Sequence, residues 1–130
     1  MKKLSVLFLT VLLSSTIFSA TASASPTTGS VSNYHSTTSS FSSFTTLSGA
    51  GKYMKFICTY SGTVTNGGYC ELRKNNGNGS TSTISNLYVG QGMSYRATDV
   101  WLNKGEEYTL VSNASISSTF GYVTASISER

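Results

Sequence analysis

The stretch KYMKFICTY, residues 52–60, limits the possible folds of this chain more than any other feature. Met54, Phe56, Cys58 and Tyr60 occupy every second position, and mostly polar side chains stand between them. This period of two is typical of a β-strand with one buried face. No segment of the chain repeats apolar residues at helical spacing, so an all-β fold is indicated.

Similar short runs follow one another along the chain, separated by turns rich in Gly and Asn. We expect one or two strands in residues 31–47, and one strand in each of the ranges 52–60, 69–74, 82–89, 94–102, 107–113 and 120–128. Residues 75–80, NNGNGS, predict a loop, and residues 103–106, NKGE, predict a hairpin with Gly105 in the left-handed conformation. About seven short strands in residues 31–130 predict one small antiparallel β-sandwich of two sheets, jelly-roll-like in organisation.

The first 24 residues predict export. Lys2 and Lys3 precede an apolar run from Leu4 to about Leu13, and the segment ends in Ala-Ser-Ala, which is the layout of a secretory signal peptide cleaved after Ala24. The run is too short and too interrupted by Ser and Thr to span a bilayer of about 30 Å. We therefore expect a secreted bacterial protein whose mature chain starts with a flexible segment, residues 25–30.

Removal of residues 1–24 changes the charge and leaves a polar chain. Nine basic residues become seven, which face five acidic ones, so the net charge falls from +4 to +2. Ser and Thr make up 35 of the remaining 106 residues, so the core must depend on few apolar side chains. A scattered charge of this size on an exported chain argues against nucleic acid as a partner.

Cys58 and Cys70 are the two cysteines, and we expect them to form a disulfide. Export favours pairing, eleven intervening residues do not fit a C-x-x-C redox motif, and a single histidine, His35, leaves too few ligands for zinc. Metals and cofactors are therefore not expected. If residues 53–60 and 68–74 pair antiparallel with Cys58 opposite Cys70, the alternating pattern gives both strands the same apolar face. A tight turn at residues 66–67 would give a different register, with Cys58 opposite Asn75, and we favour the register that the disulfide sets.

The polar face of that strand pair is the first predicted ligand-binding site. In the disulfide register it carries Tyr53, Lys55, Tyr69 and Arg73, with the two positive charges directly opposed. Like charges in that position cost stability unless something lies between them. Aromatic rings beside hydrogen-bonding groups suit the C–H faces of sugars. The alternative is an exposed sheet face whose tyrosines only reflect strand propensity.

Trp101 is the second and independent candidate. Val100 and Leu102 share one strand face, so Trp101 takes the other, and the predicted hairpin places it opposite Glu107. An outward tryptophan would be a recognition residue, whereas an inward one would be core. Residues 100–110, VWLNKGEEYTL, resemble the apolar-x-apolar-x-x-Gly-x-x-Tyr-x-apolar pattern of many bacterial secreted sandwich domains, which implies a fold and no function.

The sequence contains few candidate catalytic residues. A nucleophilic triad would need His35 and Asp99, and no motif marks a reactive serine among so many. A glycosidase would need two carboxylates across a cleft, and Glu106 and Glu107 flank a predicted turn. We therefore predict a secreted, non-catalytic binding module whose partner is an extracellular glycan or a surface protein. A small toxin or bacteriocin-like effector that acts on the envelope of other cells, and a protein-directed inhibitor, are the alternatives. Membrane contact is expected only for the toxin, for which the run STTSSFSSFTTLSG is the candidate segment.

Overall fold

The computed structural model describes residues 24–130, and all of its regular structure is β. The predicted signal peptide lies outside the described residues except for Ala24, and it stays a prediction. Within residues 24–130, no helix is long and apolar enough to cross a bilayer. The eight strands are β1 (Gly29–Tyr34), β2 (Ser42–Ser48), β3 (Lys52–Gly62), β4 (Gly68–Asn75), β5 (Thr81–Val89), β6 (Tyr95–Leu102), β7 (Glu107–Ala114) and β8 (Gly121–Ser128).

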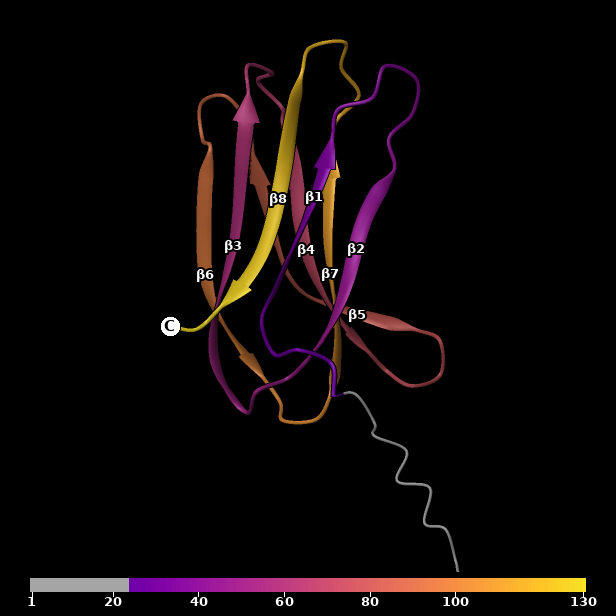
Figure 1. The fold of residues 1–130 in the computed structure, drawn as a ribbon, viewed down its shortest axis with the longest axis vertical. Helices are drawn as coiled ribbons and strands as arrows, with labels where there is room; N and C mark the ends of the chain where they lie inside the picture. Colours follow the sequence, from indigo (N-terminus) through magenta and orange to yellow (C-terminus); the bar gives the residue numbers. More distant parts are fainter. Residues whose placement is uncertain (1–23) are drawn as a thin grey trace, which may run out of the picture.

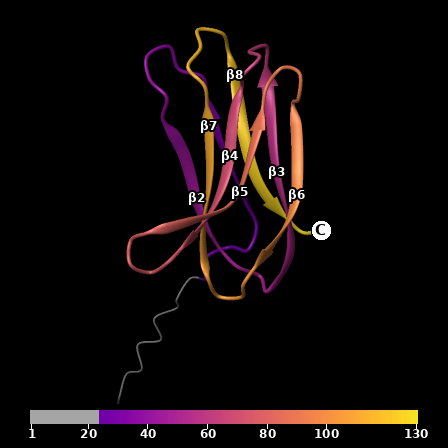
Figure 2. The same ribbon diagram turned by 180° about the vertical axis from the view of Figure 1, so that it is seen from behind.

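The strands form two four-stranded antiparallel sheets that pack face to face. The first sheet has the order β1-β8-β3-β6, and the second has the order β2-β7-β4-β5. The first sheet faces the viewer in Figure 1, and the second sheet faces the viewer in Figure 2, which shows the molecule from the opposite side. Eight strands in two such sheets form a jelly roll. The predicted fold class is therefore confirmed, with eight strands because the Ser/Thr-rich region supplies both β1 and β2.

The core lies between the sheets and follows the alternation seen in the sequence. In β3, the side chains of Met54, Phe56 and Cys58 are fully buried, while the residues between them point outward. Tyr108 and Phe56 are among the largest side chains that are almost completely buried. A few large aromatic and aliphatic side chains thus provide the apolar burial that this Ser/Thr-rich chain needs.

The disulfide between Cys58 and Cys70 is confirmed, with the two Cα atoms 5.6 Å apart. The predicted pairing of the two cysteine-bearing strands is wrong. β3 pairs with β6 and β8, whereas β4 pairs with β5 and β7, so the disulfide crosses the core from one sheet to the other. Each cysteine still points inward from its own sheet, which is why the same apolar pattern was compatible with both arrangements.

The short connection between β3 and β4 makes this crossing possible. β4 begins at Gly68, which has a φ of 143°. A Cβ atom at this position would collide with the carbonyl oxygen of Asn113 in β7. The absence of a side chain at Gly68 therefore allows the start of β4 to lie close to β7 in the second sheet.

The predicted hairpin over residues 103–106 is also wrong as a hairpin, although its turn chemistry is right. Gly105 has a φ of 77°, as expected. However, β6 belongs to the first sheet and β7 to the second, so this turn also passes from one sheet to the other. Trp101 is consequently not opposite Glu107; its partner is Tyr53 in β3.

The chain before the predicted domain start at residue 31 already contacts the sandwich. β1 begins at Gly29, and the carbonyl oxygen of Pro26 accepts a hydrogen bond of 2.9 Å from the backbone N–H of Ser48. The predicted loop at NNGNGS is confirmed, since β4 ends at Asn75 and β5 begins at Thr81.

Candidate functional site

Tyr53 and Trp101 form an aromatic pair on the outer face of the first sheet. They are direct cross-strand partners in β3 and β6, and their ring centroids lie 5.2 Å apart at an interplanar angle of 74°. Tyr53 is 53% exposed and Trp101 is 49% exposed. The core reading of Trp101 is therefore excluded, and the two candidates that the sequence treated as independent, Tyr53 and Trp101, lie side by side.

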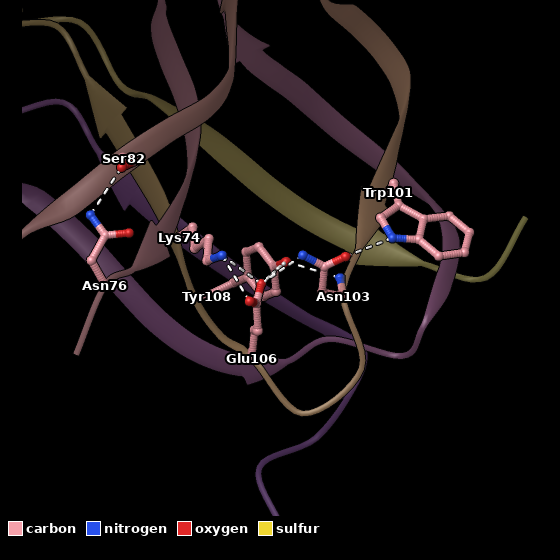
Figure 3. Close-up of polar contacts among 7 residues, drawn as sticks. All are labelled: Lys74, Asn76, Ser82, Trp101, Asn103, Glu106 and Tyr108. Atoms are coloured by element: carbon pink, nitrogen blue, oxygen red, sulfur yellow. Dashed lines mark hydrogen bonds and ion pairs between the residues drawn. The ribbon is translucent and has the colours of Figure 1, made fainter.

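A hydrogen-bond network holds the exposed indole of Trp101 in place (Figure 3). Its Nε1–H donates to Oδ1 of Asn103 at 2.8 Å, and Nδ2 of Asn103 donates to Oε2 of Glu106 at 2.8 Å. The backbone N–H of Asn103 donates to the hydroxyl of Tyr108 at 2.9 Å, and that hydroxyl donates to Glu106. Lys74 donates to Glu106 from the second sheet at 2.8 Å. The ring is thus anchored to the almost completely buried Tyr108 and to both sheets.

This network fixes the charge of Glu106. Its pKa is lowered, first by the hydrogen bond from Lys74 and then by the one from Asn103. The same contact raises the pKa of the Lys74 ammonium group. Glu106 therefore stays a carboxylate, and thus a hydrogen-bond acceptor for Asn103, at neutral pH.

Charged side chains border the aromatic pair. Lys55 lies 3.1 Å from Asp99, its cross-strand partner, and the Nε atom of Arg130 lies 3.1 Å from the other oxygen of Asp99. Lys52 and Glu129 form a further ion pair of 2.6 Å. Lys55 therefore belongs to the same area as Tyr53 and Trp101, and it shares the carboxylate of Asp99 with Arg130.

Tyr69 and Arg73 lie on the other side of the molecule. Both point outward from β4 in the second sheet, so the predicted site of Tyr53, Lys55, Tyr69 and Arg73 on one face is wrong. The physical reason is that the disulfide spans the core and does not join two strands of one ladder. Tyr69 packs against Tyr88 of β5, its cross-strand partner, with ring centroids 5.8 Å apart.

Arg73 is engaged by Glu71, two positions earlier on the same strand. Its guanidinium lies 2.6 Å from Oε2 of Glu71, and the hydroxyl of Thr83 donates to Oε1 at 2.5 Å. The hydrogen bond from Arg73 is the main cause that lowers the pKa of Glu71, which is only 8% exposed. The predicted pair of opposed charges at Lys55 and Arg73 therefore does not exist, because the two residues lie in different sheets and each contacts a carboxylate.

His35 and Asp99, the residues that a triad would need, lie at opposite ends of the first sheet. The backbone N–H of His35 donates a hydrogen bond to the carbonyl oxygen of Gly121. Asp99 forms an ion pair with Lys55, which lies opposite Ser128. Gly121 and Ser128 are the two ends of β8. The imidazole of His35 forms hydrogen bonds with the hydroxyl of Tyr60, at 2.9 Å, and with the carbonyl oxygen of Ser115.

None of the five predicted ligand-binding residues lines either of two shallow hollows, although Tyr88, the ring partner of Tyr69, lines the first. One, of about 380 Å³, is lined by Thr65, Asn66, Tyr88, Val89, Gly90, Gly92, Met93 and Arg96. The other, of about 310 Å³, is lined by Asn75, Gly77, Gly79, Ser80, Thr81 and Glu107. In residues 24–130, no group of three or more His, Cys, Asp and Glu side chains is arranged to hold a metal ion.

The chain has structural but no sequence similarity to known proteins. No family model and no curated protein matches the sequence. Among solved structures, the chain is similar to a mitogen from Yersinia pseudotuberculosis, with 10% sequence identity and a TM-score of 0.46. The similarity covers 81% of this chain and 87% of that chain. Likeness at this level carries no inference about a binding partner.

Proposed function

We propose that this chain is a secreted, non-catalytic binding module that recognises an extracellular glycan through Tyr53 and Trp101. The observation that carries the proposal is an exposed indole whose position is fixed by the protein. Each of the two residues is about half exposed, and burying apolar surface of their rings on binding is favourable. Because the indole is already held in one orientation, a ligand loses little binding free energy in ordering it.

The chemistry of the pair favours a sugar. The indole N–H donates to Asn103, so the ring presents mainly its apolar surface to a ligand. Sugars combine apolar C–H faces, which stack on aromatic rings, with hydroxyl groups at their edges. Lys55 and Asp99 lie beside the rings and offer a donor and an acceptor for such hydroxyls. This combination supports a neutral polyhydroxyl ligand, with a surface protein as the other kind of extracellular partner.

The test compares Trp101→Ala and Tyr53→Ala with Tyr88→Ala. Tyr88 is a matched control because it is an exposed tyrosine, paired with another ring, on the opposite sheet. Purified variants are titrated into cell-wall fractions and soluble polysaccharides, and bound protein is measured. We expect Trp101→Ala and Tyr53→Ala to lose about 1–2 kcal/mol of binding free energy or more, which is about 5- to 30-fold in affinity.

The control also shows how the proposal fails. Tyr88→Ala should bind like the wild type. Unchanged binding by both Trp101→Ala and Tyr53→Ala, with a folded protein confirmed by circular dichroism, would exclude this surface. An equal loss in Tyr88→Ala would show that the effect is not specific to the first sheet.

A membrane-active effector is the second candidate, and exposed phenylalanines favour it. Phe44 in the edge strand β2 and Phe41 just before it are both exposed, within the Ser/Thr-rich segment proposed above for membrane contact. Apolar side chains on an uncharged edge strand can enter a lipid interface. Release of a trapped dye from vesicles of anionic and neutral lipid, abolished by Phe41→Ser and Phe44→Ser, would support this candidate over glycan binding.

A further inference from the structure

A second aromatic cluster lies on the same outer face as Tyr53 and Trp101. It consists of Tyr34, Phe120 and Tyr122 and is called the distal cluster below. Tyr34 and Tyr122 are cross-strand partners in β1 and β8, with ring centroids 5.5 Å apart. Phe120 lies 6.2 Å from Tyr34 and 6.3 Å from Tyr122, and it is 75% exposed.

The two clusters occupy opposite ends of the first sheet. Tyr122 lies opposite Ser61 in β3, and Tyr53 is eight positions earlier on that strand with the same outward orientation. At about 3.4 Å per residue, the clusters are separated by about 27 Å along β3. β3 and β8 are neighbours at the centre of this sheet, as Figure 1 shows, so a straight path connects the clusters.

Between the Lys55–Asp99 pair and the distal cluster, the surface is uncharged and rich in hydroxyl groups. The outward side chains of this stretch, in the described strands β1, β3 and β8, are Ser30, Ser32, Ile57, Thr59, Thr124 and Ser126. The hydroxyls of Ser32 and Thr124 lie 2.7 Å apart, so the hydroxyl groups lie close together on neighbouring strands. The charged side chains of the face, Lys55, Asp99 and Arg130, stay next to Trp101.

This arrangement differs from a typical protein–protein interface. Such interfaces place their aromatic anchors near the centre, surrounded by a polar rim. Here the two aromatic clusters stand at the ends, and the strip of β3 and β8 between them carries mostly small hydroxyl side chains. One further exposed ring, Tyr95 of the edge strand β6, lies beside this strip opposite Thr59. A long, narrow, neutral partner that stacks at both ends and forms hydrogen bonds in between fits this distribution.

We propose that the ligand is one extended, neutral polysaccharide chain that lies along β3 and β8 and contacts both clusters. This inference rests on the proposed function and specifies its ligand class. Once one end of the chain is bound at Trp101, the other end is held near the distal cluster at a high effective concentration. Affinity should therefore rise steeply when the chain becomes long enough to span about 27 Å.

The experiment measures binding by calorimetry with neutral linear glucans, mannans, xylans and N-acetylglucosamine oligomers, each from disaccharides to long polymers. The variants are Tyr34→Ala with Phe120→Ala, which removes two exposed rings of the distal cluster, Trp101→Ala, and the control Tyr88→Ala. We expect the distal double variant to bind a long polymer about tenfold or more weakly, since the gain from a second contact is commonly larger than that. It should bind short oligosaccharides like the wild type, whereas Trp101→Ala should weaken both.

The outcomes separate the two proposals. Wild-type binding of polymers by the folded distal variant, or equal affinity for short and long chains, would overturn the inference and leave binding at Trp101 standing. Full binding by Trp101→Ala, or binding to none of these sugars, would overturn the proposed function as well. Preference for a polyanionic chain such as polygalacturonate would overturn the neutral ligand class.

Discussion

Replacing the disulfide with Cys58→Ala and Cys70→Ala should lower the free energy of unfolding by about 3–5 kcal/mol. The two residues are twelve positions apart, and for a loop of this size the chain-entropy model gives about 3 kcal/mol. Both cysteines are fully buried between the sheets, so the loss of two sulfur atoms from the core adds to that figure. The double variant is the suitable change because a single one would leave a free thiol.

The measurement is urea unfolding followed by circular dichroism, with thermal unfolding beside it. A domain of this size changes its melting temperature by about 4–8 °C for each kcal/mol, so a fall of more than about 12 °C is expected. The slope of the free energy against urea should increase, since an unfolded chain without the cross-link exposes more surface. Wild-type protein reduced before unfolding is the control and should show a similar loss. A loss below about 1 kcal/mol with an unchanged slope would refute the loop argument.

Three further changes test other parts of the structure. Asn103→Ala removes the acceptor for the Trp101 indole, so the fluorescence anisotropy of this single tryptophan should fall while the melting temperature changes by only a few degrees; an unchanged anisotropy would contradict the anchoring role. Glu71→Gln should make the free energy of unfolding less sensitive to acid. The hydrogen bond from Arg73 lowers the pKa of Glu71 in the folded protein below its ordinary value of 4.5, so the ionised carboxylate stabilises the fold above pH 4.5, and this stabilisation is lost as the pH falls through the lowered pKa. Parallel stability-versus-pH curves for variant and wild type below pH 4.5 would exclude this. Gly49→Ala should cost about 1–3 kcal/mol by urea unfolding, because a Cβ would collide with the carbonyl oxygen of Asn103, and a neutral effect would show that the two segments can separate freely.

The faces of the strands could be predicted from the sequence, but their partners could not. Period-two alternation in residues 52–60 identifies Phe56 and Cys58 as inward, and the structure agrees. The same alternation is satisfied whether Cys70 lies beside Cys58 in one sheet or opposite it across the core. Only the long-range pairing of β3 with β8 and of β4 with β7 decides between these, and nothing local in the sequence encodes it.

For the candidate site too, the orientation of a side chain could be predicted from the sequence but its neighbours could not. The sequence indicated that Trp101 points away from Val100 and Leu102, and it does. It could not show that Trp101 lies against Tyr53, 48 positions earlier, because the predicted hairpin gave it a different neighbour. The role of Asn103 was also missed, since an Asn in a Lys- and Gly-containing turn is ordinarily explained by the turn itself. The distal cluster carried a signal that was overlooked: Tyr122 alternates with the apolar residues of β8 and so had to face outward.

The order of the strands has a consequence for how the chain folds. β4 and β5 are the one pair of successive strands that are also neighbours in a sheet among the described residues; every other pairing joins strands distant in the chain. Folds dominated by such distant contacts must close large loops before they gain contact energy, and they fold in milliseconds to seconds. Cys58 and Cys70 are close in sequence yet belong to opposite sheets. Oxidation early in folding would therefore bring the two layers together before most strands have found their partners.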